Sequence, residues 1–124
     1  MEEGFKKTEK VESVEITVGT LFNPRGHDGE INSDRTDVIT DSGEGDTFAS
    51  ARLRQDKEGK FIQLGGTGGP ENFGQTIGQM TVDEVIEAYD LGWKKLGIGD
   101  FPEKFKTRLR EIASKGPRKL FLKS

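Results

Sequence analysis

Residues 81–115 read TVDEVIEAYDLGWKKLGIGDFPEKFKTRLREIASK, and this stretch decides the fold class because it predicts two amphipathic helices. The first helix is expected over residues 81–96, where Thr81 and Glu84 have the spacing of a capping box. Apolar residues at helical spacing then form one stripe: Val82, Ile86, Tyr89, Trp93 and Leu96. We expect this stripe, including its two aromatic residues, to belong to the hydrophobic core.

The second helix is expected over residues 101–115. Asp100 is predicted to be its N-cap, and Pro102 falls in its first turn, where proline is tolerated. Its apolar stripe consists of Phe105, Leu109 and Ile112. Because only Gly97-Ile98-Gly99 separates the two patterns, we expect the helices to form a helical hairpin.

The chain before these helices is polar and rich in glycine, and it predicts a small antiparallel β region over residues 11–64. Apolar and polar residues alternate along Val11–Phe22, which is typical of a half-buried strand with Val14, Ile16 and Val18 on one face. A short strand is expected around Thr36–Thr40. Thr47–Arg54 and Lys60–Leu64 are placed to pair as a hairpin.

Together these patterns predict an α+β fold. The expected order is a flexible arm over residues 1–10 and then a single domain over residues 11–124. Within that domain a β and loop half (11–64), a glycine-rich linker (65–80) and a helical half (81–124) follow one another, with either a final strand or a packed extension at Lys119–Leu122.

The composition limits the size of the core and the kinds of site that the chain can build. Only 31% of the residues are hydrophobic and 33% are charged, so the core should be small. The absence of cysteine excludes disulfides and cysteine-ligated zinc. The sequence has no signal peptide and no transmembrane segment, so we expect a cytoplasmic protein or a component of a particle assembled in the cytoplasm.

Charge is distributed unevenly along the chain. Residues 1–100 hold 20 acidic against 11 basic residues, whereas residues 101–124 hold 2 against 8. The basic C-terminal segment suggests contact with an acidic partner. The candidate partner-binding residues are Lys104, Arg108, Arg110, Lys115, Arg118 and Lys119. Nucleic acid is a possible partner but is not favoured, because the pI of the whole chain is near 5.3.

Two carboxylates offer an alternative, enzymatic interpretation. Glu44 and Asp46 lie in a loop between glycines, and paired carboxylates are what glycoside hydrolases use. This pair would make the protein a carboxylate-dependent glycan hydrolase of the peptidoglycan type.

Two further segments suggest ligands only weakly. Asp28, Glu30, Asn32 and Asp34 alternate as oxygen ligands of calcium can, yet they lack the glycine and final glutamate of an EF-hand loop. Gly65–Pro70 lacks the Gly-Lys-Ser/Thr of a phosphate-binding loop, so a hinge or surface turn is favoured. His27, the single histidine, is interpreted as a loop residue. We therefore expect neither a metal nor a cofactor.

The preferred functional hypothesis is a non-catalytic interaction or assembly component of a larger complex, anchored by the helical hairpin. A thin core and a β region with long loops favour completion of the fold by a protein partner or by self-assembly. The alternatives are a nucleic-acid-binding accessory protein and the glycan hydrolase described above.

Overall fold

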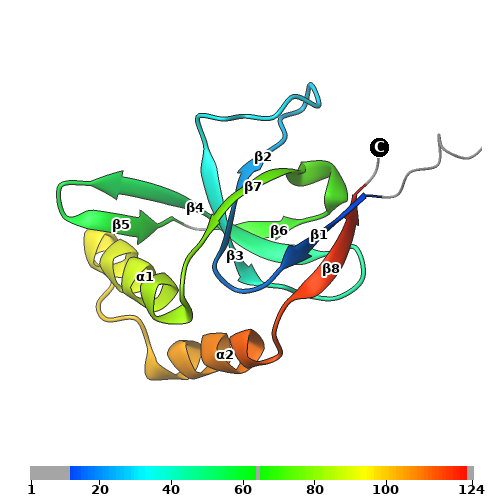
Figure 1. Ribbon diagram of the computed structural model, residues 1–124. Coiled ribbons are helices and arrows are strands. Elements are labelled where there is room, and N and C mark those ends of the chain that lie inside the picture. Colours follow the sequence, from blue (N-terminus) through cyan, green and yellow to red (C-terminus); the bar gives the residue numbers. More distant parts are fainter. Residues whose placement is uncertain (1–11, 64, 123–124) are drawn as a thin grey trace, which may run out of the picture.

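The computed structural model describes residues 12–63 and 65–122, so the predicted arm over residues 1–10 lies outside the described residues. The fold is α+β, as predicted: seven antiparallel strands are followed by two helices and a final strand (Figure 1). The strands are β1 (Glu12–Ile16), β2 (Thr20–Pro24), β3 (Thr36–Asp41), β4 (Phe48–Asp56), β5 (Gly59–Ile62), β6 (Gly66–Gly68), β7 (Phe73–Gln79) and β8 (Arg118–Leu122). The helices are α1 (Val82–Leu96) and α2 (Glu103–Ser114), and a short 3-10 turn, η2 (Pro70–Asn72), joins β6 to β7.

Most strands belong to one curled antiparallel sheet. Its order is β5-β4-β3-β2-β7, and β6 pairs with β4 alongside β5. Because β6 lies on β4 and β7 lies on β2, the short η2 turn between them carries the chain from one edge of the sheet to the other. The sheet therefore curls back on itself. β1 and β8 form a separate two-stranded ribbon, which confirms the predicted final strand.

The predicted strand over Val11–Phe22 is wrong as a single element. A turn at residues 17–19 divides it, with the Thr20 amide donating to the Thr17 carbonyl. β1 then pairs with β8, and β2 enters the main sheet. As a result Ile16 and Val18 do not share a face but lie in different hydrophobic clusters.

The glycine-rich segment at residues 65–80 does not form a linker, because residues 66–68 and 73–79 are strands of the sheet. Close packing explains the glycines. A Cβ atom on Gly74 would lie 2.3 Å from the carbonyl oxygen of Asn23, so a larger residue would push β7 away from β2. Here glycine marks the close approach of two strands.

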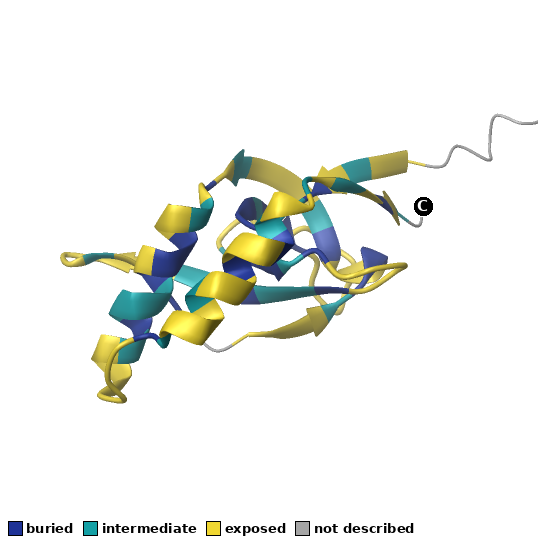
Figure 2. Cartoon of the chain, turned by 90° about the horizontal axis from the view of Figure 1, so that it is seen from below, coloured by how far each residue is buried: buried dark blue, intermediate teal, exposed yellow. Residues whose placement is uncertain are grey.

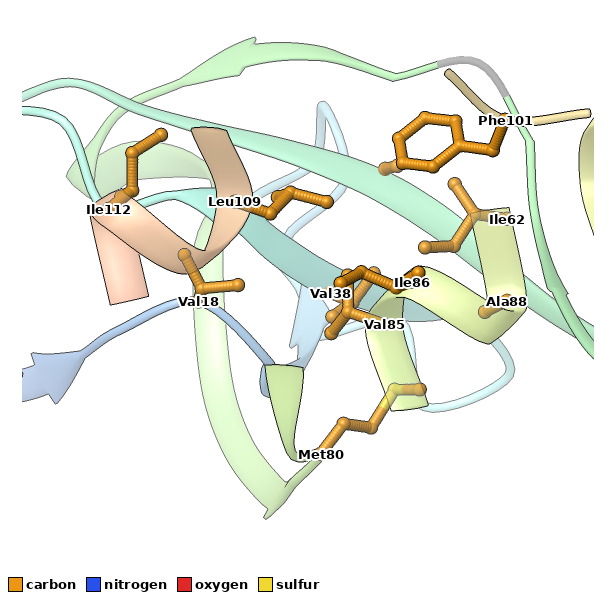
Figure 3. Packing of buried hydrophobic residues seen from close by; sticks show 11 residues of the cluster. Val18, Val38, Ile62, Met80, Val85, Ile86, Ala88, Phe101, Leu109 and Ile112 are labelled. Carbon is orange, nitrogen blue, oxygen red and sulfur yellow. The ribbon is translucent and has the colours of Figure 1, made fainter. Parts of the chain in front are cut away.

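The core consists of two clusters on opposite faces of the sheet. The helix-side core lies between the sheet and the helices and includes Val38, Val85, Ile86, Leu109 and Ile112 (Figure 3). The sheet core lies within the curl and consists of Ile16, Phe22, Ile39, Phe48, Phe73 and Leu120. Val38 and Ile39 are consecutive in β3 and contribute to different clusters, as the alternation of side chains along a strand requires.

Both predicted helices are confirmed, and each buries one face against the sheet while its other face stays exposed (Figure 2). The Thr81–Glu84 capping box is present: the Glu84 amide donates to Thr81 Oγ1, and the Thr81 amide donates to Glu84 Oε1. The prediction of Asp100 as N-cap is wrong, because Pro102 occupies that position. A proline disfavours helical geometry in the residue before it, so α2 begins only after Pro102.

The remaining predictions for the β half are confirmed in outline. β3 covers the expected Thr36–Thr40, and β4 and β5 form the expected hairpin. Among the described residues, no helix is long and apolar enough to cross a membrane.

Candidate functional site

An apolar groove lies where α1, α2 and the end of β3 meet. It has a volume of about 290 Å³, and we call it the aromatic groove. Its lining includes Thr40, Asp41, Tyr89, Trp93, Phe101, Phe105, Arg108, Leu109 and Ile112. The residues come from three elements, so the groove exists only once the helices have packed on the sheet.

Contacts between aromatic rings hold the wall of the groove. The rings of Tyr89 and Phe101 are stacked with centroids 4.6 Å apart, and Trp93 meets Phe101 edge-on at 5.6 Å. Phe105 follows at 6.2 Å from Trp93. Phe101 is buried at the centre of this chain of rings, whereas Tyr89 and Trp93 are half-buried. Trp93 and Tyr89 therefore belong partly to the core, as predicted, and partly to an open surface.

Phe105, which lines the groove, is a large apolar side chain that is 40% exposed. Leu96 is 59% exposed and lies elsewhere, at a hollow that it shares with Phe61 and Ile62 of β5. The sequence placed Leu96 and Phe105 on the apolar stripes, so the expectation that both stripes are fully buried is wrong. Phe105 therefore gives the groove an apolar side chain that is open to solvent.

Charged groups accompany the apolar lining. Arg108 and Asp41 lie at the groove, and the Lys104 ammonium lies 5.3 Å from the ring centre of Phe105. Burial raises the pKa of the Tyr89 hydroxyl, and a hydrogen bond with Thr40 partly opposes that shift. The groove is therefore an apolar site whose charged neighbours are Arg108 and Lys104 of α2 and the Asp41 carboxylate of β3, which leaves one positive charge in excess.

The six basic residues predicted to bind a partner have different environments. Arg108 and Lys104 accompany the aromatic groove, and Arg110 forms an ion pair of 3.3 Å with Asp83 of α1. Lys115 and Lys119 are exposed. These environments could not be predicted from the sequence, because periodicity marks the buried face of α2 but does not show which side chains of other elements, such as Asp83, lie beside its basic residues.

Arg118 has a structural role within the described fold. Its guanidinium donates hydrogen bonds of 2.7, 2.9 and 2.7 Å to the carbonyl oxygens of Ser42, Gly45 and Thr47. A fourth bond goes to the carbonyl of Lys119. Arg118 thus fastens the β1–β8 ribbon to the loop between β3 and β4.

The predicted carboxylate pair lies in that same loop. Glu44 and Asp46 are both exposed, and neither lines the aromatic groove. A general acid in glycoside hydrolysis needs a raised pKa, which burial in an apolar pocket provides. The exposed loop gives neither carboxylate such a pocket.

Three of the predicted oxygen ligands, Asp28, Glu30 and Asn32, line one exposed hollow, but local hydrogen bonds use two of the four side chains. Asp28 Oδ1 accepts a hydrogen bond from the Glu30 amide, and Asn32 Oδ1 accepts one from the Asp34 amide. Within residues 12–63 and 65–122, no group of three or more His, Asp or Glu side chains is arranged to hold a metal ion. These side chains shape the turns of an exposed loop.

A second, polar hollow lies on the other side of the sheet, and sequence analysis did not predict it. It has a volume of about 450 Å³ and is lined by Arg25, Arg35 and Arg52 together with Asp37, His27 and residues 65–68. No local pattern could reveal it, because its arginines belong to three separate segments of the chain. Only the pairing of β2, β3 and β4 brings those segments together.

Comparisons with family models, with curated proteins and with solved structures find no match to this chain.

Proposed function

We propose that this protein is a non-catalytic interaction component that binds another protein through the aromatic groove. The observation that carries the proposal is the combination of half-buried Tyr89 and Trp93 with exposed Phe105 around one groove. Tyr, Trp, Phe and Arg are enriched at the centres of protein interfaces, where a few such residues supply most of the binding free energy.

The groove also supports a specific chemistry for the partner. Its volume of about 290 Å³ suits one or two apolar side chains better than a whole ligand of drug size. Arg108 and Lys104 lie beside it. The partner should therefore offer an apolar side chain with an acidic residue next to it. As expected from the sequence, we place this partner in the cytoplasm or in a particle assembled there.

A site-specific crosslinking experiment tests the proposal. A photoreactive phenylalanine analogue replaces Phe105 in one variant and Phe121 in a matched control. Both positions are exposed phenylalanines, but only Phe105 lines the groove. We expect irradiation in extract to crosslink one protein to the Phe105 variant and not to the Phe121 variant. Substitution of Trp93 by Ala in the crosslinking variant should abolish the product.

Light scattering after size-exclusion chromatography separates the two kinds of partner. If the crosslinked protein is a second copy of this chain, the wild type should be an oligomer and Phe105→Ser a monomer. Equal crosslinking from positions 105 and 121, or no product from either, would contradict the proposal.

A further inference from the structure

The polar hollow, which we call the arginine cleft, opens on the face of the sheet away from the helices. Arg52 alternates in β4 with Ala51 and Leu53, which pack against the helix-side core. Alternation along a strand therefore directs Arg52 to the opposite face. Arg25 follows β2, and Arg35 precedes β3, so the pairing of three neighbouring strands assembles the cleft.

The charges that line this cleft are not balanced within it. Three arginines face a single carboxylate, Asp37, which leaves an excess of two positive charges. The whole chain has the opposite sign, with a net charge of −3. A guanidinium remains charged at any pH at which a protein is folded. The cleft is thus a local positive site on an acidic protein, which favours an anion there.

Asp37 orients one arginine and leaves another available. Its side chain is 7% exposed, and its oxygens accept hydrogen bonds of 2.9 and 3.4 Å from Arg35 Nε and Nη2. Arg25 Nη1 donates to the Gly29 carbonyl at 2.6 Å. Arg52 is half-buried, and its guanidinium has no hydrogen bond or ion pair with any of the residues that the structure describes. The donors of Arg52 therefore suit a ligand in the cleft.

The glycine-rich segment forms another part of the lining, where it runs beside β4. A Cβ atom on Gly65 would lie 1.9 Å from the carbonyl oxygen of Ser50, so only glycine lets this segment approach β4 so closely. Thr67 and Asn72 add a hydroxyl and an amide to the lining. These neutral polar groups can bond to the hydroxyl groups of a ligand whose anionic end contacts the arginines.

We infer that the arginine cleft binds the phosphate monoester of a small molecule. A phosphate monoester carries close to two negative charges at neutral pH, which equals the excess charge of the cleft. The planar guanidinium fork of Arg52 matches phosphate oxygens in geometry as well as in charge. The volume of about 450 Å³ falls within the range of small-molecule sites and exceeds the needs of a bare anion.

Titration calorimetry with ribose 5-phosphate tests this inference. Ribose, inorganic phosphate and succinate serve as comparison ligands, because they separate the contributions of the sugar, the phosphate and a dicarboxylate. We expect ribose 5-phosphate to bind most tightly, inorganic phosphate more weakly, and ribose and succinate least.

Arg52→Gln and Arg54→Gln make a matched pair of variants. The two arginines are neighbours on one face of β4, but Arg54 donates to Gln63 and does not line the cleft. Arg52→Gln should weaken binding about tenfold or more, the effect of losing a charge-assisted hydrogen bond, and Arg54→Gln should leave it unchanged. If Arg52→Gln unfolds the protein, the exposed Arg25→Gln takes its place with the same expectation.

Three results would overturn the inference. They are no binding of ribose 5-phosphate by the wild type, equal weakening by the Arg52 and Arg54 variants, and tighter binding of succinate than of either phosphate. Binding only of single-stranded oligonucleotides, with none of ribose 5-phosphate, would also reject a small-molecule site. Phe105→Ser should bind ribose 5-phosphate normally, because the aromatic groove shares no lining residue with the cleft.

Discussion

The helix-side core and the sheet core differ in how their residues are distributed along the chain. Much of the helix-side core comes from residues 80–112, where buried side chains recur at helical spacing. The sheet core collects single residues from β1, β2, β3, β4, β7 and β8, and three of its six members are phenylalanines. The first cluster reflects local periodicity and the second reflects tertiary pairing. This difference predicts where the protein is most sensitive to substitution.

The largest effect is expected at the centre of the sheet core. Phe22 is only 1% exposed. Its ring is stacked on that of Phe73 with the centroids 4.6 Å apart, and it meets the ring of Phe48 edge-on with the centroids 5.7 Å apart. Phe22→Ala should lower the free energy of unfolding by about 3–5 kcal/mol. Trp93→Ala should lower it by roughly 2 kcal/mol, because Trp93 is only half-buried and loses less transfer free energy.

Urea denaturation followed by circular dichroism measures the free energy of unfolding of both variants. This signal does not depend on tryptophan fluorescence, which the Trp93 substitution removes. A loss at Trp93 that equals or exceeds the loss at Phe22 would show that the helix-side core dominates stability.

A smaller loss of unfolding free energy than at Phe22 is expected from substitution of Arg118, which fastens the β1–β8 ribbon to the sheet. Arg118→Met keeps the length and apolar stem of the side chain but removes its hydrogen bonds to Ser42, Gly45 and Thr47. We expect a loss of about 2 kcal/mol, reduced by partial exposure of the site to water. The control, Lys119→Met, changes an exposed neighbour and should stay within about 0.5 kcal/mol of the wild type. Similar values for the two variants would mean that the ribbon is held by its apolar residues Ile16 and Leu120 and not by Arg118.

The helical half should show a more modest effect at its cap. Thr81→Ala removes the acceptor of the hydrogen bond from the Glu84 amide and should lower the free energy of unfolding by about 1 kcal/mol. Thr81→Ser keeps the hydroxyl and should be nearly neutral. The same denaturation assay distinguishes them, and equal losses from Ala and Ser would show that the hydroxyl bond is unimportant.

The smallest effect concerns pH. The hydrogen bond from the Thr81 backbone amide, together with the Thr81 side chain, lowers the pKa of Glu84 below its ordinary value of 4.5. A carboxyl with a lowered pKa in the folded state stabilises the fold above its ordinary pKa, and this contribution is lost as pH falls through the folded value. Stability measured from pH 6 to pH 3 should therefore fall less steeply in Glu84→Gln than in the wild type. An equally steep fall in Glu84→Gln and in the wild type would show that the Glu84 carboxylate does not contribute to this pH dependence.

The features that could be predicted best from the sequence are those that depend on a few neighbouring residues. The Thr81–Glu84 box spans four residues, and it located the start of α1 correctly. The predicted start of α2 was wrong for an equally local reason. Asp100 is a residue type that often caps helices, but Pro102 disfavours helical geometry in the residue before it and is itself the N-cap. The alternation of Val14, Ile16 and Val18 was also misleading, because a period of two continues across the turn at residues 17–19.

Long-range features were beyond the reach of the sequence alone. Phe22, Phe48 and Phe73 lie in three segments that are far apart in the sequence, and only strand pairing reveals their common cluster. The aromatic groove was not predicted, because Tyr89 and Trp93 were assigned to the core through the α1 stripe and the end of β3 was not placed beside them. The arginine cleft was missed, since no spacing in the chain relates Arg25, Arg35 and Arg52.

The pairing of β1 with β8 has a consequence for the order of folding. Ile16 and Leu120 enter the sheet core from the first and last strands of the described chain. Contacts between residues so distant in sequence form slowly, whereas the local contacts of α1 and α2 form quickly. The N-terminus of a nascent chain leaves the ribosome first. Phe22, Phe48 and Phe73 therefore emerge well before β8, the strand that contributes Leu120 to the same cluster. We expect the nascent chain to expose this aromatic cluster until Leu120 has left the exit tunnel. Pairing of β8 with β1 is then the folding step after which the nascent chain is no longer prone to aggregate through this cluster.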